Sequence, residues 1–306
     1  MPLRVVCFAL SIVLLVPLRP LASQAADTTR RGQPAGGCPS CAEWNAPQRP
    51  FRIYGNTYYV GTRGLSALLV TSSDGHVLVD AGLPESAPSI AANVRALGFR
   101  VEDIEMILIS HAHFDHAGGV AALQRASGAV VAASPRSASV LRRGRSGPDD
   151  PQYGVSLPFP PVPVVTEIAD RDPVRMGSLT LTPHFTPGHT PGGTSWSWRS
   201  CEAGRCLDLV YADSQTPVSA DGFYFTRSQT YPSALEDFAR GLARLDQLPC
   251  DVLLTPHPGF SDLFERIAAR DRGGATALAD RGACRRYVTA ARQRLARRVE
   301  TETGTP

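Results

Sequence analysis

Short apolar runs with the two-residue period of β-strands occupy both halves of the chain. In the run at residues 65–82, the Asp-Gly pair at residues 74–75 predicts a hairpin turn, because this pair tolerates the positive φ of a tight reversal. Residues 178–185 and 193–200 are expected to pair with each other. The expected strands are residues 56–62, 65–82, 104–110, 128–134, 178–185, 193–200, 207–213 and 251–258.

Runs with helical periodicity separate these strands. The first of them stops at Gly98, a residue type that commonly ends helices. Both halves of the chain therefore contain strands as well as helices, which predicts an α/β fold with one domain over residues 51–306. Residues 301–306 are expected to be disordered. The expected helices are residues 86–97, 118–127, 135–143, 232–248, a segment from residue 262 onward, and 283–299.

The first 25 residues have the three-part layout of a cleaved secretory signal, with Arg4, an apolar run and small residues near Ala25. A membrane anchor is the alternative. It is disfavoured because Pro17 breaks the run, which is also shorter than the ~20 residues that a span needs. We therefore expect export to the periplasm without a stable membrane anchor. Residues 26–50, rich in Gly, Pro, Arg and Ala, predict an N-terminal arm.

Charge is nearly balanced in the expected mature protein. The formal net charge of +3 falls to +1 without residues 1–25, because this segment holds two arginines and no acidic residue. The arginine pairs at residues 142–143, 285–286 and 297–298 have no interleaved aromatic residues, which favours a solvated surface over a nucleic-acid track. We expect a monomer with no nucleic-acid partner.

Six cysteines follow the expected leader, an even number in an oxidising compartment, which allows three disulfides. Cys201 and Cys206 flank an expected hairpin tip, and Cys250 with Cys284 would join a strand to the last helix. The sequence alone leaves the connectivity open.

Cys38 and Cys41 are then left to each other, although a bridge from either of them to a neighbouring pair stays open. A zinc ion held by four cysteines is a further alternative. It is disfavoured because such sites use closely paired motifs.

The segment 109–119, ISHAHFDHAGG, concentrates ligand-type residues in the loop between an expected strand and helix. Alternate residues of an extended chain point the same way, so His111 and His113 can hold one ion from one side. Asp115 and His116 lie where the loop enters the helix and can face a second ion. Neutral imidazole and carboxylate suit zinc, and loops at the carboxyl ends of strands commonly carry the sites of α/β folds.

Two later histidines also follow strand ends: His189 in TPGHTPGG and His257 in LLTPHPG. A lone histidine in a Gly/Pro loop is more often a surface residue. Beside a motif that already has four ligand-type residues, both are expected to complete two metal sites. His76 and His184 lie within strand segments and are expected to be structural or surface residues.

HxHxDH in a strand-to-helix loop, a later glycine-flanked histidine and a last histidine beyond a terminal strand resemble the metallo-β-lactamase superfamily over about residues 51–300. The resemblance implies an αβ/βα sandwich, with two mixed β-sheets flanked by helices and two zinc ions in the cleft between the sheets. Residues 211–222, together with HTPGGTSWSW, resemble subclass B3 metallo-β-lactamases. Carried over by position, the first zinc has His111, His113 and His189, and the second has Asp115, His116 and His257.

Two departures separate the chain from the other subclasses. Subclass B1 uses a cysteine ligand where this chain has Ser214, and subclass B2 has Asn where this chain has His111. Pairing of Cys250 with Cys284 also resembles subclass B3.

The resemblance implies hydrolysis of the β-lactam amide bond of penicillins, cephalosporins and carbapenems, and hence antibiotic resistance. A hydroxide between two zinc ions would supply the nucleophile, because zinc lowers the pKa of water towards ~7. The first zinc would stabilise the oxyanion that forms when the lactam carbonyl is attacked, and the second would contact the amide nitrogen as it leaves. Asp115 would also orient the water or shuttle its proton.

Further residues are expected around the reacting centre. Hydroxyls at the places of Ser214 and Thr216 bind the substrate carboxylate in subclass B3; the alternative is that both are turn residues. Gln152 resembles a substrate-facing glutamine found in some members. Asp80 is expected to orient ligands through hydrogen bonds, because a carboxylate just past a buried strand needs partners.

Two rival functions remain at this stage. A lactonase or glyoxalase II-like thioesterase would use an aspartate to bridge both metals, and Asp213 is the candidate. The leader, Ser214 with Thr216 and the run at residues 219–223 argue against it. A non-catalytic zinc-binding protein is disfavoured because the chain keeps all six ligands.

Overall fold

The computed structural model describes residues 37–273 and 278–304. The leader expected over residues 1–25 and the first part of the arm expected over residues 26–50 lie outside the described residues. Over the two described ranges, no helix combines the length and apolar character needed to cross a bilayer.

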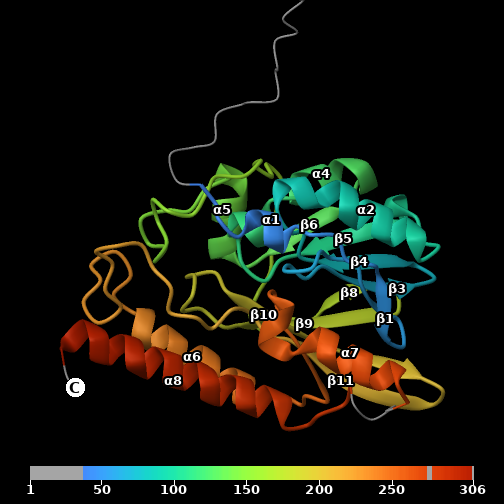
Figure 1. Ribbon diagram of the computed structural model, residues 1–306. Helices are drawn as coiled ribbons and strands as arrows, with labels where there is room; N and C mark the ends of the chain where they lie inside the picture. The colour runs from blue at the N-terminus through green and yellow to red at the C-terminus, as the bar shows by residue number, and fades with distance from the viewer. Residues whose placement is uncertain (1–36, 274–277, 305–306) are drawn as a thin grey trace, which may run out of the picture. The chain divides into compact units, whose positions relative to one another are not determined.

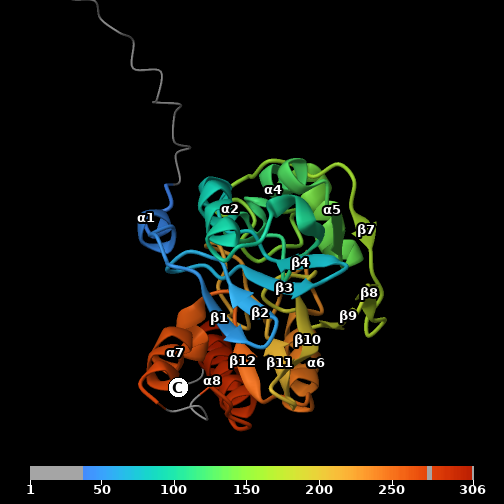
Figure 2. The ribbon, with the colours of Figure 1, turned by 90° about the vertical axis from the view of Figure 1, so that its right-hand side faces the viewer.

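From Cys38 onward the chain forms two β-sheets that face each other (Figures 1 and 2). The first sheet contains, in spatial order, β1 (Phe51–Tyr54), β2 (Thr57–Tyr59), β3 (Leu68–Ser72), β4 (Gly75–Val79), β5 (Ile104–Leu108), β6 (Val130–Ala133) and β7 (Thr166–Glu167). The second contains β12 (Val252–Leu254), β11 (Arg205–Tyr211), β10 (Thr194–Glu202), β9 (Leu179–Phe185) and β8 (Val174–Met176). Both sheets mix parallel and antiparallel pairs.

Helices cover the outer faces of both sheets, with α2, α4 and α5 on the first and α6 and α8 on the second (Figure 1). The α-helices are α1 (Cys41–Trp44), α2 (Ala87–Ala96), α3 (Phe114–Ala117), α4 (Val120–Ser127), α5 (Pro135–Arg143), α6 (Ala234–Asp246), α7 (Leu263–Asp271) and α8 (Ala283–Thr303). Short 3₁₀ turns are η1 (Pro84–Ser86), η2 (Val101–Asp103) and η3 (Pro258–Ser261). This arrangement confirms the expected αβ/βα sandwich.

The core between the two sheets is built from large apolar side chains. Tyr59, Trp196 and Tyr211 are fully buried there. The Nε1 atom of Trp196 donates a hydrogen bond to the carbonyl oxygen of Ile109, at 3.0 Å. Because Ile109 immediately precedes the histidine motif, the core fixes the point from which that motif departs.

Three disulfides join Cys38 to Cys41, Cys201 to Cys206 and Cys250 to Cys284. Cys201 and Cys206 are partners in the β10–β11 register, across the hairpin tip. The bridge from Cys250 to Cys284 spans 34 residues and ties the segment before β12 to the first turn of α8. In the chain-entropy model, a loop of this length destabilises the unfolded chain by about 4 kcal/mol when closed.

The long strands and helices lie close to their expected positions, but short edge strands are additional. The hairpin turn lies at residues 73–74, one residue before its expected place. β1, β7 and β8 were not expected, because they are only two to four residues long and all their side chains except that of Ile53 are exposed or half-buried. Residues 114–117, expected as loop, form the helical turn α3.

The expected disorder of residues 301–306 is wrong for the first part of that segment. Helix α8 runs on to Thr303, beyond the expected end at Val299. The reason is an anchor that the sequence pattern did not reveal: the carboxylate of Glu302 accepts hydrogen bonds from the backbone of Phe225 and Thr226. Residues 305–306 lie outside the described residues.

Candidate metal centre

The six expected ligands come from three loops and meet at one end of the sheets. His111, His113, Asp115 and His116 follow β5, His189 lies between β9 and β10, and His257 follows β12. The strands that precede these segments are packed together in the core around Trp196. His111 and His257, almost 150 residues apart in the sequence, therefore lie at the same end of the sheets.

One group of donors consists of His111, His113 and His189. One ligand atom from each lies within 4.8 Å of the others, and all three side chains are buried. The ring centroids lie 4.8 Å apart for His111 and His113, and 4.9 Å apart for His111 and His189. This spacing suits three imidazoles around a single ion.

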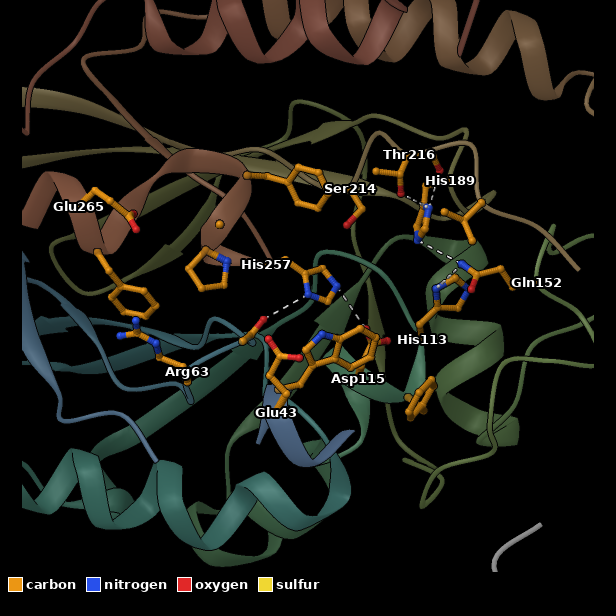
Figure 3. Close-up of a pocket in the computed structure, with 18 residues that line it drawn as sticks. Glu43, Arg63, His113, Asp115, Gln152, His189, Ser214, Thr216, His257 and Glu265 are labelled. Carbon is orange, nitrogen blue, oxygen red and sulfur yellow. Dashed lines mark hydrogen bonds and ion pairs between the residues drawn. The ribbon is translucent and has the colours of Figure 1, made fainter. Parts of the chain in front are cut away.

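The second group adjoins the first. One ligand atom from each of His111, Asp115 and His116 lies within 4.8 Å of the others. An oxygen of Asp115 lies 3.2 Å from Nε2 of His116 and 3.4 Å from Nε2 of His257. Asp115, His116 and His257 therefore surround a second position, as Figure 3 shows for Asp115 and His257.

Hydrogen bonds from the outer nitrogens aim the rings inward. Nδ1 of His189 donates to the carbonyl oxygen of Thr216 at 2.8 Å, and Nδ1 of His257 donates to that of Gly64 at 3.1 Å. In a neutral imidazole this leaves the Nε2 lone pair free for a metal. Such outer contacts are the usual means of orienting metal-binding histidines.

Two aspartates support the remaining rings. Oδ1 of Asp213 lies 2.8 Å from Nδ1 of His111, and both side chains are fully buried. The carboxylate of Asp150 lies 2.9 and 3.1 Å from Nε2 of His113. Sequence reasoning missed the role of Asp150. The only available signal was a pair of acidic residues at 149–150, in the loop between α5 and β7.

The position of Asp213 bears on the rival thioesterase function. Its carboxylate contacts the outer nitrogen of His111 and lies outside both donor groups found among the described residues. Gly193 packs against the other oxygen so closely that a Cβ there would lie 2.4 Å from it. Asp213 is therefore packed behind His111 and does not stand between the two positions, where a bridging carboxylate is needed.

Burial shapes the charges of the cluster. Burial and the neighbouring histidines lower the pKa of His111 well below its usual range and that of His189 to about 3, so both rings are neutral. Burial also raises the pKa of the Asp213 carboxyl well above its ordinary value. Neutral rings are ready to accept a metal ion without first losing a proton.

Asp115 and His116 behave as an ion pair. Burial alone would raise the pKa of Asp115, but His116 and His257 outweigh it and hold that pKa well below its usual range. Burial opposes charge on His116 too, yet the carboxylate of Asp115 raises its pKa above the ordinary value. Asp115 is therefore a carboxylate at neutral pH.

Asp80, expected to orient ligands, lies behind the motif. Its Oδ1 accepts from the backbone nitrogen of Ser110 at 2.7 Å, and its Oδ2 accepts from the hydroxyl of Tyr211 at 2.8 Å. Oδ2 also lies 3.8 Å from Nδ1 of His116. Asp80 adopts a φ of 61°, a conformation that aspartate tolerates better than most residues.

A cavity of about 700 Å³ opens onto the cluster. Figure 3 shows Ser214 and Thr216 on one side, with Gln152 beside the rings of His113 and His189. The amide nitrogen of Gln152 lies 3.5 Å from Nδ1 of His113 and 3.4 Å from Nε2 of His189. The three residues expected to meet substrate thus line the same cavity as four of the expected ligands, His113, Asp115, His189 and His257.

The wall near His257 was not expected from the sequence. Trp44, in the N-terminal arm, packs against His257 with the rings tilted by 56° and their centroids 5.1 Å apart. Gly64 is required beside it, because a Cβ at that position would lie 2.6 Å from the Cα atom of Trp44. Phe260 and Phe264 extend this wall.

The donor set fits zinc. Nε2 of His111 is buried and has no hydrogen-bond partner in the described part of the chain, and the ring of His116 meets only the carboxylates of Asp115 and Asp80, at 3.2 and 3.8 Å. Leaving such atoms unpaired costs about 1–3 kcal/mol each, which coordination of an ion would remove. Histidine nitrogens with one carboxylate are ligands that zinc prefers.

Comparison with known proteins agrees with this geometry. The model of the metallo-beta-lactamase superfamily matches residues 60–261. The structure of Rm3 metallo-beta-lactamase is 55% identical, with a TM-score of 0.86 over 87% of this chain and 99% of that one. That of MEM-A1, a subclass B3 metallo-beta-lactamase from a soil metagenome library, is 47% identical, with a TM-score of 0.84 over 86% and 100%.

Hydroxyacylglutathione hydrolase of Anaeromyxobacter dehalogenans is 35% identical over 147 residues, which are 48% of this chain and 44% of that protein. The chain therefore spans less than half the length of this curated relative. The family match, in contrast, includes all six expected ligands. Both the fold and that match establish that the chain belongs to the metallo-beta-lactamase superfamily.

Proposed function

We propose that the chain is a subclass B3 metallo-β-lactamase that hydrolyses the amide bond of β-lactam antibiotics with two zinc ions and confers resistance to them. The observation that carries the proposal is the convergence of six zinc-type donors on a cavity that also contains Ser214 and Thr216. The likeness to Rm3, at 55% identity, supports the same substrate class.

Under this proposal, His111, His113 and His189 hold one zinc ion, and Asp115, His116 and His257 hold the other. Bound zinc supplies a nucleophilic water at neutral pH and polarises the lactam carbonyl. The rings of His111, His113, His189 and His257 are turned by Asp213, Asp150 and the carbonyl groups of Thr216 and Gly64.

Asp115 would orient the attacking water and accept its proton, because it stays ionised at neutral pH. Ser214 and Thr216 would bind the carboxylate that common β-lactams carry. Gln152 would meet the substrate from the opposite side of the histidines. The contact at 3.1 Å between the Thr216 hydroxyl and Nδ1 of His189 also couples this substrate residue to a ligand.

We also propose that the protein acts as a monomer in the periplasm. Its three disulfides suit an oxidising compartment. Asp80 would act on the site through Ser110 and His116, as a support of the motif that carries the ligands.

Hydrolysis of a glutathione thioester is the second candidate, favoured by the likeness to hydroxyacylglutathione hydrolase. The location of Asp213 behind His111 argues against it. Nitrocefin and a lactoylglutathione thioester should be tested side by side, with EDTA and then with added zinc. We expect nitrocefin turnover that EDTA abolishes and zinc restores. Thioester turnover without nitrocefin turnover would overturn the proposal.

A further inference from the structure

One side of the cavity is formed by a long loop between β11 and α6, residues 212–233, which we call the β11–α6 loop. It contributes Ser214, Thr216 and Val218 to the cavity wall and has no regular secondary structure. A loop of this length requires side-chain contacts to hold one conformation. Figure 1 shows it, in orange, beside the end of α8 marked C.

Arg298, on α8, reaches across to this loop. Its guanidinium donates to the carbonyl oxygen of Pro217 at 3.3 Å, to the hydroxyl of Ser219 at 2.8 Å and to the carbonyl oxygen of Phe223 at 2.9 Å. It also lies 5.1 Å from the ring centre of Phe225. The planar guanidinium of Arg298 therefore contacts four residues of the loop.

Glu302, one turn later on α8, completes the contact. One carboxylate oxygen accepts from the backbone nitrogen of Phe225 at 3.0 Å, and the other from that of Thr226 at 2.9 Å. Arg298 donates from Nε to the same carboxylate at 2.5 Å. Only 2% of the Glu302 side chain is exposed. A carboxylate buried to this degree, with two of its contacts directed at one loop, is unusual on the last turn of a helix.

The loop is also anchored by aromatic packing. Phe225 is 2% exposed and packs against Phe238 of α6, with ring centroids 5.7 Å apart. Val218, by contrast, is 51% exposed and faces the cavity. The stretch that faces substrate is therefore held from behind by residues that do not touch the cavity.

Two further hydrogen bonds connect the held stretch to the site. The carbonyl oxygen of Thr216 accepts from Nδ1 of His189, and Pro217, the next residue, is held by Arg298. The backbone nitrogen of Ala220 donates to the carbonyl oxygen of Pro151, which precedes Gln152. The β11–α6 loop thus meets both His189 and the segment that carries Gln152.

We propose that Arg298 and Glu302 are positioning residues that clamp the β11–α6 loop against the end of α8 and so fix Thr216 and Val218 for β-lactam binding. The assignment of the ligand rests on the proposed function. The clamp itself is a property of the chain and can be tested without any substrate.

The first test is limited trypsin digestion of the full protein, followed by mass spectrometry of the Arg227–Ser228 bond. This bond lies directly after the clamped residues, and Arg227 is exposed. We expect trypsin to cleave the Arg298→Ala and Glu302→Gln variants at this bond at least about tenfold faster than the unsubstituted protein, because the loop opens locally. The matched controls are Arg297→Ala and Glu300→Gln, exposed neighbours on the same helix.

The second test is steady-state kinetics with several β-lactams. We expect Arg298→Ala to raise KM about five- to tenfold while kcat changes less than about twofold, because binding contacts shift and the donors to zinc remain. Bound zinc should stay at two ions per chain. Arg298→Lys keeps the charge but loses the planar guanidinium, so its KM should lie between those of Arg298→Ala and the unsubstituted protein. Ser219→Ala removes one contact and should raise KM less than Arg298→Ala does.

Equal cleavage at Arg227–Ser228 in Arg298→Ala and Arg297→Ala would overturn the clamp. Faster cleavage with an unchanged KM would overturn the positioning role. Absence of β-lactam turnover in the unsubstituted protein would contradict the proposed function instead. The trypsin digestion would still show whether Arg298 and Glu302 hold the loop. If Arg298→Ala does not fold, Arg298→Lys and Ser219→Ala decide the same question.

Discussion

Asp213 lies directly behind His111, with its Oδ1 atom 2.8 Å from Nδ1 of the ring. This contact turns Nε2 of His111 towards the other histidines, and the carboxylate is thereby removed from the metal positions. A residue that could bridge two ions in a thioesterase therefore becomes a support for one ligand.

Replacing that support should weaken zinc binding. We expect Asp213→Asn to lower zinc affinity about 10- to 100-fold, because the amide no longer fixes the imidazole tautomer. Competition with a chromophoric chelator measures the affinity. Asp208→Asn, at a half-buried position of the preceding strand β11, is the control. An unchanged affinity in Asp213→Asn would show that the His111 contact is dispensable.

Loss of one ligand should remove one ion. We expect His113→Ala to retain about one zinc ion instead of two and to lose at least about 100-fold in kcat/KM, because three donors define the first position. Metal analysis and nitrocefin assays check this. His184→Ala, which alters a buried histidine outside the cluster, should keep both ions. Two retained ions in His113→Ala would contradict the ligand assignment.

Ser214 should act on substrate binding rather than on chemistry. We expect Ser214→Ala to raise KM about three- to tenfold with little change in kcat, since a hydroxyl contact to the substrate carboxylate is present before the reaction begins. The exposed Ser178→Ala variant is the control. An unchanged KM for every β-lactam tried would exclude the assigned role.

Zinc retention should depend on pH in a defined order. Asp115 raises the pKa of His116, so protons compete with zinc for His116 as the pH falls through that raised pKa. His111 and His189 have lowered pKa values, so their neutral forms persist to more acidic solutions. During dialysis from pH 7 to pH 5, the ion held by His116 should be lost first. Simultaneous loss of both ions, or prior loss from His189, would contradict this order.

The fold, and the meeting of the candidate zinc donors at one end of the sheets, could be predicted where the sequence signals were local. Long apolar strands such as residues 104–110 and the compact HAHFDH motif carry their patterns within a few positions. The two-residue strand β7, Thr166–Glu167, has both side chains exposed, so no pattern marks it.

The contacts of Asp213 and Asp150 with the histidines could not be predicted, because they join residues far apart in the sequence. Asp213 and His111 are 102 residues apart, and Asp150 and His113 are 37 apart. Glu302 meets Phe225 across 77 residues, which is why the end of α8 was expected to be disordered. In each case the chain must be folded before the polar group finds its partner.

Trp44 also sets a limit on how this chain can be shortened. A version beginning at Phe51 would keep every strand and all six zinc-type donors, yet it would lack the indole that lies against His257. Loss of the amino-terminal arm would therefore open the cavity to solvent beside His257.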